Sequence, residues 1–201
     1  MYNSLTTDEL TSHLTAATLG DEDACAWLYH RFSSRVFRFA VGLLGDADDA
    51  EEVTQDAFVY AFRNLRRFDA TRSSFGTWLF TIAISRCRNK RRRKWLESIP
   101  LHLWEKRGQH VGASFRRDDR EVESALEARG VRRHVWAAVR ALSPKLREAI
   151  ALRYFGELSY IEMGRVIGIS PKTAESRVRL GLKAIRERLT ESELELEWEV
   201  G

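Results

Sequence analysis

The spacing of apolar residues constrains the fold of this chain more than any other feature. They recur three or four positions apart along almost the whole sequence, as in the run Leu28, Phe32, Val36, Phe39 and Leu43. Such spacing places apolar side chains on one face of an α-helix. No segment before residue 190 has the alternation that is typical of a strand. The sequence therefore predicts an all-α protein.

The helical periodicity fails between residues 96 and 117. Apolar residues there share no common face, and Pro100, Gly108 and Gly112 appear. This pattern is typical of a linker, and 201 residues are enough for two small cores. We therefore expect two small helical domains joined by a flexible linker. The predicted segments are a first domain at 1–94, the linker at 95–118, a second domain at 119–189 and an acidic tail at 190–201.

Cysteine usage and hydropathy argue against several classes of protein. Cys25 and Cys87 lie far apart and form no CxxC pair, so the sequence indicates neither a disulfide framework nor a zinc site. No apolar run approaches the roughly 20 residues needed to cross a bilayer, and the N-terminus lacks the features of a signal peptide. We expect a cytoplasmic protein without membrane insertion, metal or cofactor.

Residues 144–189 carry the pattern of a helix-turn-helix unit. Ser159 and Glu162 have the spacing of a capping box, which opens a short helix that ends at Gly168. Ser170 and Pro171 then start a second helix at once. This second helix has the position of a recognition helix, which lies in the major groove of DNA.

The two helices of this unit have an apolar face and a polar face. The residues that we expect to face inward are Ile161, Val166, Ile167, Ala174, Val178, Leu182 and Ile185. The side chains available to base edges and phosphates are Lys172, Thr173, Ser176, Arg177, Arg179 and Lys183. A helical hairpin with merely solvated basic residues is the alternative. It gives no reason for the capping box, the turn glycine and the Ser-Pro restart to occur together.

The first domain contains an acidic segment at residues 46–56, where we expect a third helix to start. Carboxylates in the first turn meet the positive end of the helix dipole, which accounts for Asp48 and Asp49. The dipole explains less about Gln55 and Asp56, which lie one or two turns further along. An acidic surface at this place suits a basic partner.

A fourth predicted helix ends in a basic run. Seven of the nine residues from Arg86 to Lys94 are Arg or Lys, a composition that suits phosphate contact. A solvated helix end is the alternative, because bases are also favourable near a helix C-terminus. The segment before the run combines aromatic and polar side chains, the mixture that holds unpaired bases. Its members are Phe68, Arg72, Ser73, Ser74, Phe75 and Trp78.

Motifs in both domains resemble bacterial sigma factors. Those that resemble the second conserved sigma domain are Glu52-Val-Thr-Gln-Asp-Ala-Phe58, Arg66-Arg-Phe-Asp69 and Ser74-Phe-Gly-Thr-Trp-Leu-Phe-Thr-Ile-Ala83. Those that resemble the fourth are Leu142-Ser-Pro-Lys-Leu-Arg-Glu148, Arg153-Tyr-Phe155, Leu158-Ser-Tyr-Ile-Glu162 and Ser176-Arg-Val-Arg179. Because only a short linker separates them, the chain is similar to an extracytoplasmic-function sigma factor over about residues 20–190.

The resemblance implies a factor that binds core RNA polymerase, directs it to a promoter and helps to open the duplex, without being an enzyme. By motif position, core polymerase would contact Glu52, Gln55, Asp56 and Phe62. The minus-ten element, including its unpaired non-template strand, would contact Phe68, Arg72, Ser73, Ser74, Phe75, Trp78, Arg86 and Lys90. The minus-thirty-five duplex would contact Arg153, Lys172, Thr173, Ser176, Arg177, Arg179 and Lys183. Family members are commonly held by an anti-sigma factor, so such a partner is also implied.

Two rival function classes use fewer of these features. A stand-alone helix-turn-helix regulator explains residues 144–189 but leaves the acidic helix, the aromatic segment and the basic run without a shared purpose. A nucleic-acid enzyme lacks support because the sequence has neither a metal-ligand cluster nor a phosphate-binding glycine loop.

The tail has an acid at every odd position from 191 to 199, and the residues between them from 194 onward are apolar, a period of two rather than 3.6. One interpretation is a disordered acidic extension that keeps a basic protein soluble. The other is a segment that docks on a basic apolar surface, either this protein's own DNA-binding face or a regulator.

Overall fold

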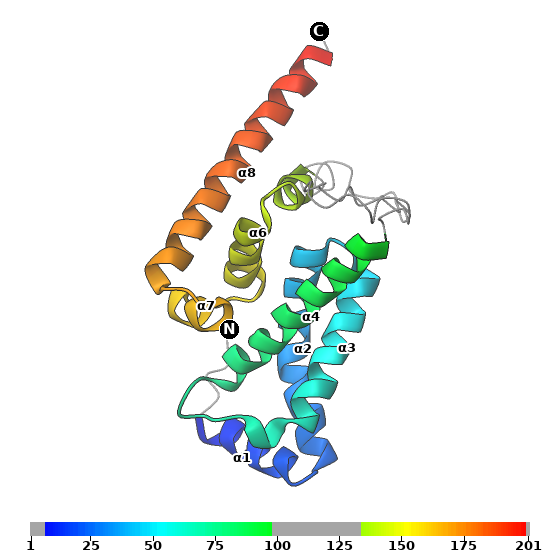
Figure 1. Cartoon of the computed structure of the whole chain (residues 1–201), viewed down its shortest axis with the longest axis vertical. Coiled ribbons are helices and arrows are strands. Elements are labelled where there is room, and N and C mark those ends of the chain that lie inside the picture. The colour runs from blue at the N-terminus through cyan, green and yellow to red at the C-terminus, as the bar shows by residue number, and fades with distance from the viewer. Residues whose placement is uncertain (1–6, 98–133, 200–201) are drawn as a thin grey trace, which may run out of the picture.

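The computed structural model describes residues 7–97 and 134–199, and within these ranges it contains helices and no strand (Figure 1). This confirms the all-α prediction. Most of the predicted linker and the predicted start of the second domain, at residue 119, lie outside the described residues.

The first domain is built from four α-helices and one short 3-10 turn. They are α1 (Thr7–Thr18), α2 (Glu22–Leu44), α3 (Ala47–Arg63), the 3-10 turn η1 (Leu65–Arg67) and α4 (Phe75–Glu97). Side-chain caps set two of the starts: Asp21 Oδ1 accepts from the Ala24 N–H at 2.8 Å, and Asp46 Oδ1 accepts from the Asp49 N–H at 2.8 Å. Gly45 ends α2 with a φ of 75°, a left-handed conformation that glycine adopts without strain.

The core of the first domain lies where α2, α3 and α4 pack together. All five residues of the apolar run on α2 are buried, as the helical spacing predicts: Leu28, Phe32, Val36, Phe39 and Leu43. Leu79, Phe80 and Cys87 meet them from α4. Burial raises the pKa of the Cys87 thiol to about 12, so this side chain stays neutral and packs as a small apolar group.

The second domain contains the predicted helix-turn-helix. A helical segment at 134–140 is followed by α6 (Pro144–Ile150), the π-helical turn η3 (Ala151–Phe155), α7 (Tyr160–Ile167) and α8 (Pro171–Glu199). Buried Arg147 links the first two elements, because its guanidinium donates to the carbonyl oxygens of Arg140 and, at 3.1 Å, Leu142. These bonds satisfy carbonyls that the helix end leaves without intrahelical partners.

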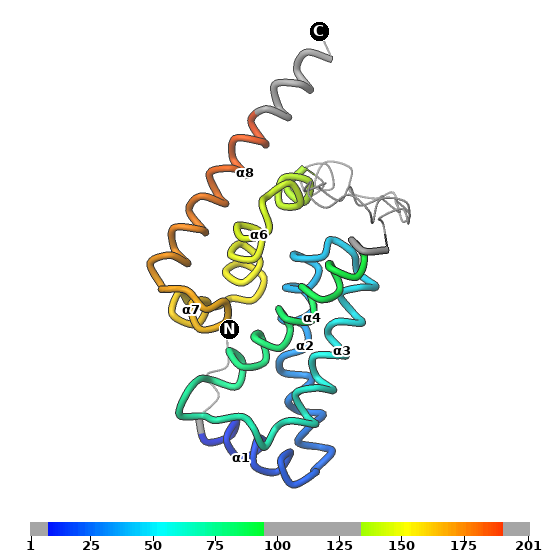
Figure 2. Tube along the Cα trace, viewed as in Figure 1, coloured from blue at the N-terminus to red at the C-terminus, as the bar shows by residue number. Residues whose placement is uncertain are grey.

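The second domain lies against α2 and α4 of the first, as the chain trace shows (Figure 2). Buried apolar residues of both domains form one continuous cluster, to which the second domain contributes Leu152 of η3, Leu158 of the turn after it and Met163 of α7. Helix α8 packs on α6 and α7 and continues to Glu199 (Figure 1). The alternating tail is therefore helical up to residue 199, contrary to the interpretation of a disordered extension.

Candidate functional site

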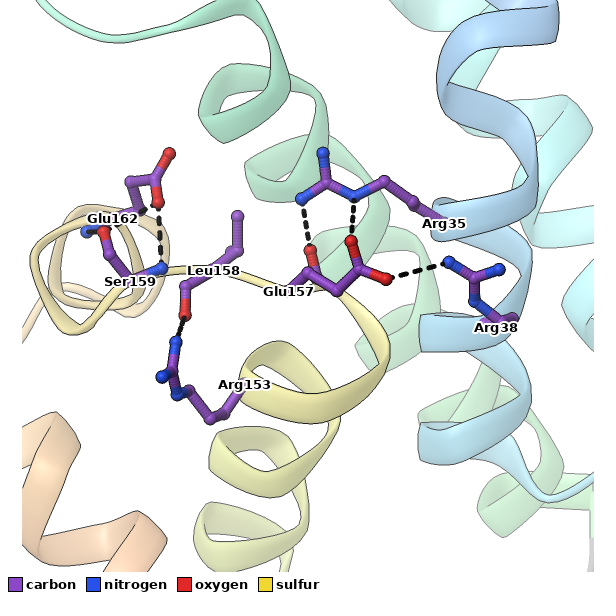
Figure 3. Close-up of polar contacts among 8 residues, drawn as sticks. Arg35, Arg38, Arg153, Glu157, Leu158, Ser159 and Glu162 are labelled. Atoms are coloured by element: carbon purple, nitrogen blue, oxygen red, sulfur yellow. Dashed lines mark hydrogen bonds and ion pairs between the residues drawn. The ribbon is translucent and has the colours of Figure 1, made fainter. Parts of the chain in front are cut away.

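The start of α7 has the geometry of a complete capping box. The Ser159 N–H donates to Glu162 Oε2 at 2.9 Å, and the Glu162 N–H donates to Ser159 Oγ at 3.3 Å (Figure 3). Gly168 then adopts a φ of 70° and permits the turn. At the start of α8, Ser170 Oγ accepts from the Thr173 N–H at 3.1 Å. The helix-turn-helix prediction is confirmed at each of these signals.

The inward faces of α7 and α8 differ from the prediction at two positions. Ile161 is 59% exposed and Leu182 is 39% exposed, so both face solvent in this structure. Val166, Ala174 and Val178 are buried as predicted, and Met163 on α7 and Gly181 on α8 are buried in addition. A Cβ at Gly181 would lie 2.8 Å from Ile150 Cγ1, so this glycine lets α8 approach α6 closely.

The polar face of α8 points away from the rest of the domain. Lys172, Thr173, Arg179 and Lys183 are exposed, and Ser176 is half-buried between them. Arg177 is also half-buried, because it lies nearer to the packed side of the helix. Lys183 has one acidic neighbour on this helix, Glu187, at 3.7 Å. The structure therefore brings five of the predicted duplex-contacting residues onto one accessible stripe.

Arg153 is engaged within its own domain. One of its guanidinium N–H groups donates to the Leu158 carbonyl oxygen at 2.9 Å (Figure 3), and its Cζ atom lies 5.1 Å from the centroid of the Tyr160 ring. Both contacts hold the turn between η3 and α7. Arg153 therefore stabilises this turn, a role that the sequence motif did not suggest.

The loop before α4 is ordered by its own side chains. Asp69 Oδ1 accepts from the Thr71 N–H at 2.9 Å and from the Thr71 hydroxyl at 2.6 Å. These hydrogen bonds lower the pKa of Asp69. Ser74 Oγ then caps α4 by accepting from the Thr77 N–H at 3.2 Å. The loop presents Arg72 to solvent and leaves Ser73 half-buried.

Three aromatic rings support this loop, but they are not equally accessible. Phe68, Phe75 and Trp78 contact one another with ring centroids 5.5–5.9 Å apart. Phe68 and Trp78 are half-buried, whereas Phe75 is only 1% exposed and also packs on Phe32. The Phe75 ring is thus part of the core, which corrects the expectation that it offers a stacking surface to a base.

Helix α3 exposes Glu52, Gln55 and Asp56, the residues expected to meet core polymerase. The fourth, Phe62, is half-buried and lies 5.7 Å from the Phe58 ring. The same stretch also exposes Val59, at 47%. Its spacing of four from Gln55 is a signal that could have marked it as part of the same helix face.

The acidic start of α3 and the basic run of α4 pair with each other. Lys90 Nζ lies 3.4 Å from Asp49 Oδ1 and also contacts Glu52 Oε2, while Lys94 Nζ contacts Asp49 Oδ2. The hydrogen bond between Lys90 and Glu52 raises the pKa of Lys90 and lowers that of Glu52. One predicted DNA contact and one predicted polymerase contact are therefore ion-pair partners.

Arg86 lies along the same helix as Lys90 and contacts an aromatic ring. Its Cζ atom is 4.9 Å from the centroid of Tyr60 on α3. This distance is within the range of a cation–π contact, which holds the guanidinium at the α3–α4 boundary.

Residues 7–97 and 134–199 contain no group of three or more His, Cys, Asp or Glu side chains arranged to hold a metal ion. None of the helices described there is long and apolar enough to cross a membrane.

Comparison with known proteins gives matches for both domains. The family models sigma-70 region 2 and sigma-70 region 4 match residues 28–97 and 132–185. The ECF RNA polymerase sigma factor SigW of Bacillus subtilis is 29% identical over 174 residues, which cover 85% of this chain and 91% of SigW. SigK of Mycobacterium tuberculosis is 30% identical over 167 residues, covering 83% of this chain and 86% of SigK.

Two solved structures share the fold. CnrH, solved in complex with the cytosolic domain of CnrY, gives a TM-score of 0.65 at 24% identity and covers 89% of this chain and 96% of CnrH. The sigma factor RpoE of Bartonella quintana, solved with the anti-sigma factor NepR, gives 0.61 at 22% identity, with coverages of 82% and 96%.

Proposed function

The chain belongs to the extracytoplasmic-function sigma factors, and we propose which of its surfaces performs each step of transcription initiation. A factor of this family binds core RNA polymerase and directs it to promoters. The observation that carries the proposal is that region 2 and region 4 occur in one chain, each with an accessible polar surface. As an initiation factor, this protein acts through binding rather than as an enzyme, and it works in the cytoplasm beside polymerase.

Core polymerase binds the exposed face of α3 in our proposal. Glu52, Gln55 and Asp56 supply an acidic and hydrogen-bonding surface, and Val59 adds an exposed apolar contact beside them. Charge complementarity with a basic partner speeds association and fixes orientation. Phe62 supports this surface from its half-buried position against Phe58.

The minus-ten element binds the loop before α4 and the adjacent part of that helix. Arg72 and Ser73 offer hydrogen bonds to an unpaired base, while the half-buried rings of Phe68 and Trp78 offer stacking surface. Ser74 and Phe75 support the loop without touching DNA: Ser74 caps α4, and Phe75 anchors the loop in the core. Duplex phosphates bind Arg86 and Lys90, and Lys90 exchanges its carboxylate partners to reach them.

The minus-thirty-five element binds the exposed stripe of α8. Thr173, Ser176 and Arg179 lie where a recognition helix meets base edges, and Lys172 and Lys183 reach the backbone. Arg177 contributes from the edge of the stripe, and Arg153 contributes by holding the turn that positions α7. An anti-sigma factor is the regulatory partner that this family membership suggests.

Copurification with core polymerase tests the proposal directly. The full chain is expected to bind core polymerase, and the double substitution of Gln55 and Asp56 by Ala should weaken binding by about 1 kcal/mol or more. Glu9→Ala is the matched control, because Glu9 is an exposed carboxylate on α1, away from α3. A chain that binds duplex DNA but never joins core polymerase would instead favour a stand-alone regulator.

A further inference from the structure

Arg147 of α6 is a buried guanidinium without a carboxylate partner. Only 8% of this residue is exposed. Its Nη2 atom donates to the carbonyl oxygens of Arg140 and Leu142, but its Nε atom is buried and has no hydrogen-bond partner among the described residues. Arg147 also forms no ion pair within the described parts of the chain. A buried charge destabilises a fold unless an opposite charge pairs with it.

Other arginines at the boundary between the domains do have such partners. Arg35 Nε lies 3.6 Å from Glu157 Oε2, and Arg38 Nη2 lies 3.1 Å from Glu157 Oε1 (Figure 3). Arg88 of α4 donates from Nε and Nη2 to the two carboxylate oxygens of Glu148, at 2.9 and 2.7 Å. Both Glu148 oxygens are therefore engaged, and Glu157 already faces two arginines.

Two further arginines lie beside Arg147, one from each domain. Arg91 follows Arg88 by about one turn, on the part of α4 that meets α6. Arg140 lies just before α6, and its Cδ atom is 3.2 Å from the position that a Cβ on Gly45 would occupy. The stem of this arginine is therefore held at the end of α2. In the described part of the chain, neither arginine forms an ion pair.

The three guanidinium groups repel one another. Burial and, after it, the positive charges of Arg91 and Arg140 lower the pKa of Arg147 to about 10. Arg147 still carries its charge at neutral pH, so three positive charges converge where α4 meets the start of α6. An anion between them would replace this repulsion with attraction.

Helix capping explains only part of this arrangement. The bonds from Nη2 of Arg147 satisfy carbonyl oxygens at the end of the preceding helical segment. That role uses one nitrogen of the guanidinium and requires neither its Nε atom nor Arg91. A ligand that accepts from Nε and balances the three charges accounts for the remaining features.

We propose that Arg91, Arg140 and Arg147, here called the arginine corner, bind the phosphate groups of a small free compound. The planar guanidinium group matches a pair of phosphate oxygens, and linked phosphates carry enough negative charge to balance three arginines. Exposed Arg140 and half-buried Arg91 turn onto the anion, which reaches Arg147 from their side. This inference goes beyond the proposed function, because such binding needs neither polymerase nor a promoter.

The burial of Arg147 favours a small ligand over the backbone of duplex DNA. The duplex contacts proposed for α8 are made by exposed side chains such as Lys172 and Arg179. Arg147 lies instead where α4, α6 and the end of α2 come together. A phosphate held in a duplex carries its neighbours with it, whereas a small free phosphate compound does not.

Calorimetric titration of the free full-length chain with pyrophosphate, at constant ionic strength, tests the arginine corner. The wild-type chain should bind pyrophosphate at one site. Arg91→Gln and Arg140→Gln should each weaken this binding about tenfold or more, because each removes a charged hydrogen-bonding group. Arg147 is left unchanged because it also caps the preceding helical segment.

Lys145→Gln is the matched control. It removes an exposed positive charge from α6, two positions from Arg147, and should change the dissociation constant by less than about twofold. Thermal unfolding gives a second readout, since a ligand that binds the folded state raises the midpoint. Pyrophosphate should raise the midpoint of the wild-type and Lys145→Gln chains more than that of Arg91→Gln or Arg140→Gln.

Two more titrations identify the source of the phosphate. ATP should compete with pyrophosphate if the ligand is a nucleotide, and lack of competition would assign the site to inorganic phosphates. Duplex DNA should bind wild type and Arg140→Gln equally. A loss of duplex affinity in this variant as large as its loss of pyrophosphate affinity would overturn the proposal in favour of the DNA backbone. Absence of pyrophosphate binding in the wild type, or equal binding by all variants, would also overturn it.

Discussion

At the scale of single residues, Arg177 and Arg179 show how position on α8 separates two similar side chains. Arg179 is exposed on the outward stripe, whereas Arg177 is half-buried towards the packed side. Arg179→Ala should weaken binding to the minus-thirty-five duplex by about 1–3 kcal/mol and leave core binding unchanged. Arg177→Ala should weaken binding to the same duplex by less. Titration of duplex DNA with the full chain measures both, and a larger loss for Arg177→Ala would refute this assignment.

Phe75 gives a second prediction, because it is buried in a segment expected to touch DNA. Phe75→Ala should lower the free energy of unfolding by about 3–5 kcal/mol through lost packing. Arg72→Ala, in the same loop, should leave stability within about 0.5 kcal/mol and weaken minus-ten binding instead. Urea unfolding of both variants checks the contrast. Equal stability of the two would place the Phe75 ring outside the core.

The sequence predicted the chemical types of these side chains better than their partners. The basic run and the acidic helix start were both recognised, but their mutual pairing through Lys90 was not. Two charge clusters 30 or more positions apart can face a ligand or each other, and composition does not distinguish these cases. The packing of α3 on α4 determines that these two clusters face each other.

At the scale of elements, the capping box of α7 should make stability depend on pH. Burial acts to raise the pKa of Glu162, but hydrogen bonds from Ser159 and Thr77 outweigh it, and the pKa is lowered from 4.5. A lowered carboxyl pKa stabilises the fold above about pH 4.5, and this contribution is lost as pH falls through the lowered value. The stability gap between wild type and Glu162→Gln should therefore shrink from about pH 6 to about pH 3.

Unfolding curves across this pH range measure that gap. Ser159→Ala is the companion variant, because it removes the other half of the capping box. It should lower the free energy of unfolding by about 1 kcal/mol near neutral pH. A gap between wild type and Glu162→Gln that stays constant with pH would mean that the ionised carboxylate adds nothing to the cap.

The crossing of α8 over α6 depends on Gly181. A Cβ at this position would lie 2.8 Å from Ile150 Cγ1 and 3.7 Å from the Leu146 carbonyl oxygen. Gly181→Ala should therefore destabilise the second domain by about 1–3 kcal/mol through overpacking, despite the better helix propensity of alanine. Thermal unfolding checks this, and a raised midpoint would show that the crossing relaxes freely.

Helix existence and helix ends were predictable, whereas the inward faces were only partly so. Caps and left-handed glycines are local signals, and Ser159, Gly168 and Ser170 acted as the sequence indicated. Ile161 and Leu182 have apolar spacing but face solvent, because α7 and α8 are covered on only part of their surface. The alternating tail became helix since extending an existing helix is favourable and Glu and Leu are good helix formers.

At the scale of the whole molecule, the contact between domains was beyond sequence reasoning. It joins residues 60 to 122 positions apart, and no periodic pattern connects Arg35 with Glu157 or Gly42 with Phe155. The motifs identified the two domains, and the family resemblance indicated that both act in transcription initiation. The arrangement of the domains relative to each other required the structure.

Transcription from a library of promoter fragments tests the central claim most directly. Core polymerase alone should give little specific initiation, and adding the full chain should produce defined 5′ ends downstream of a shared pair of sequence elements. The matched chain with Gln55 and Asp56 changed to Ala should produce the same ends at lower yield. If the 5′ ends are the same with and without the chain, this protein does not direct promoter choice and the account is wrong.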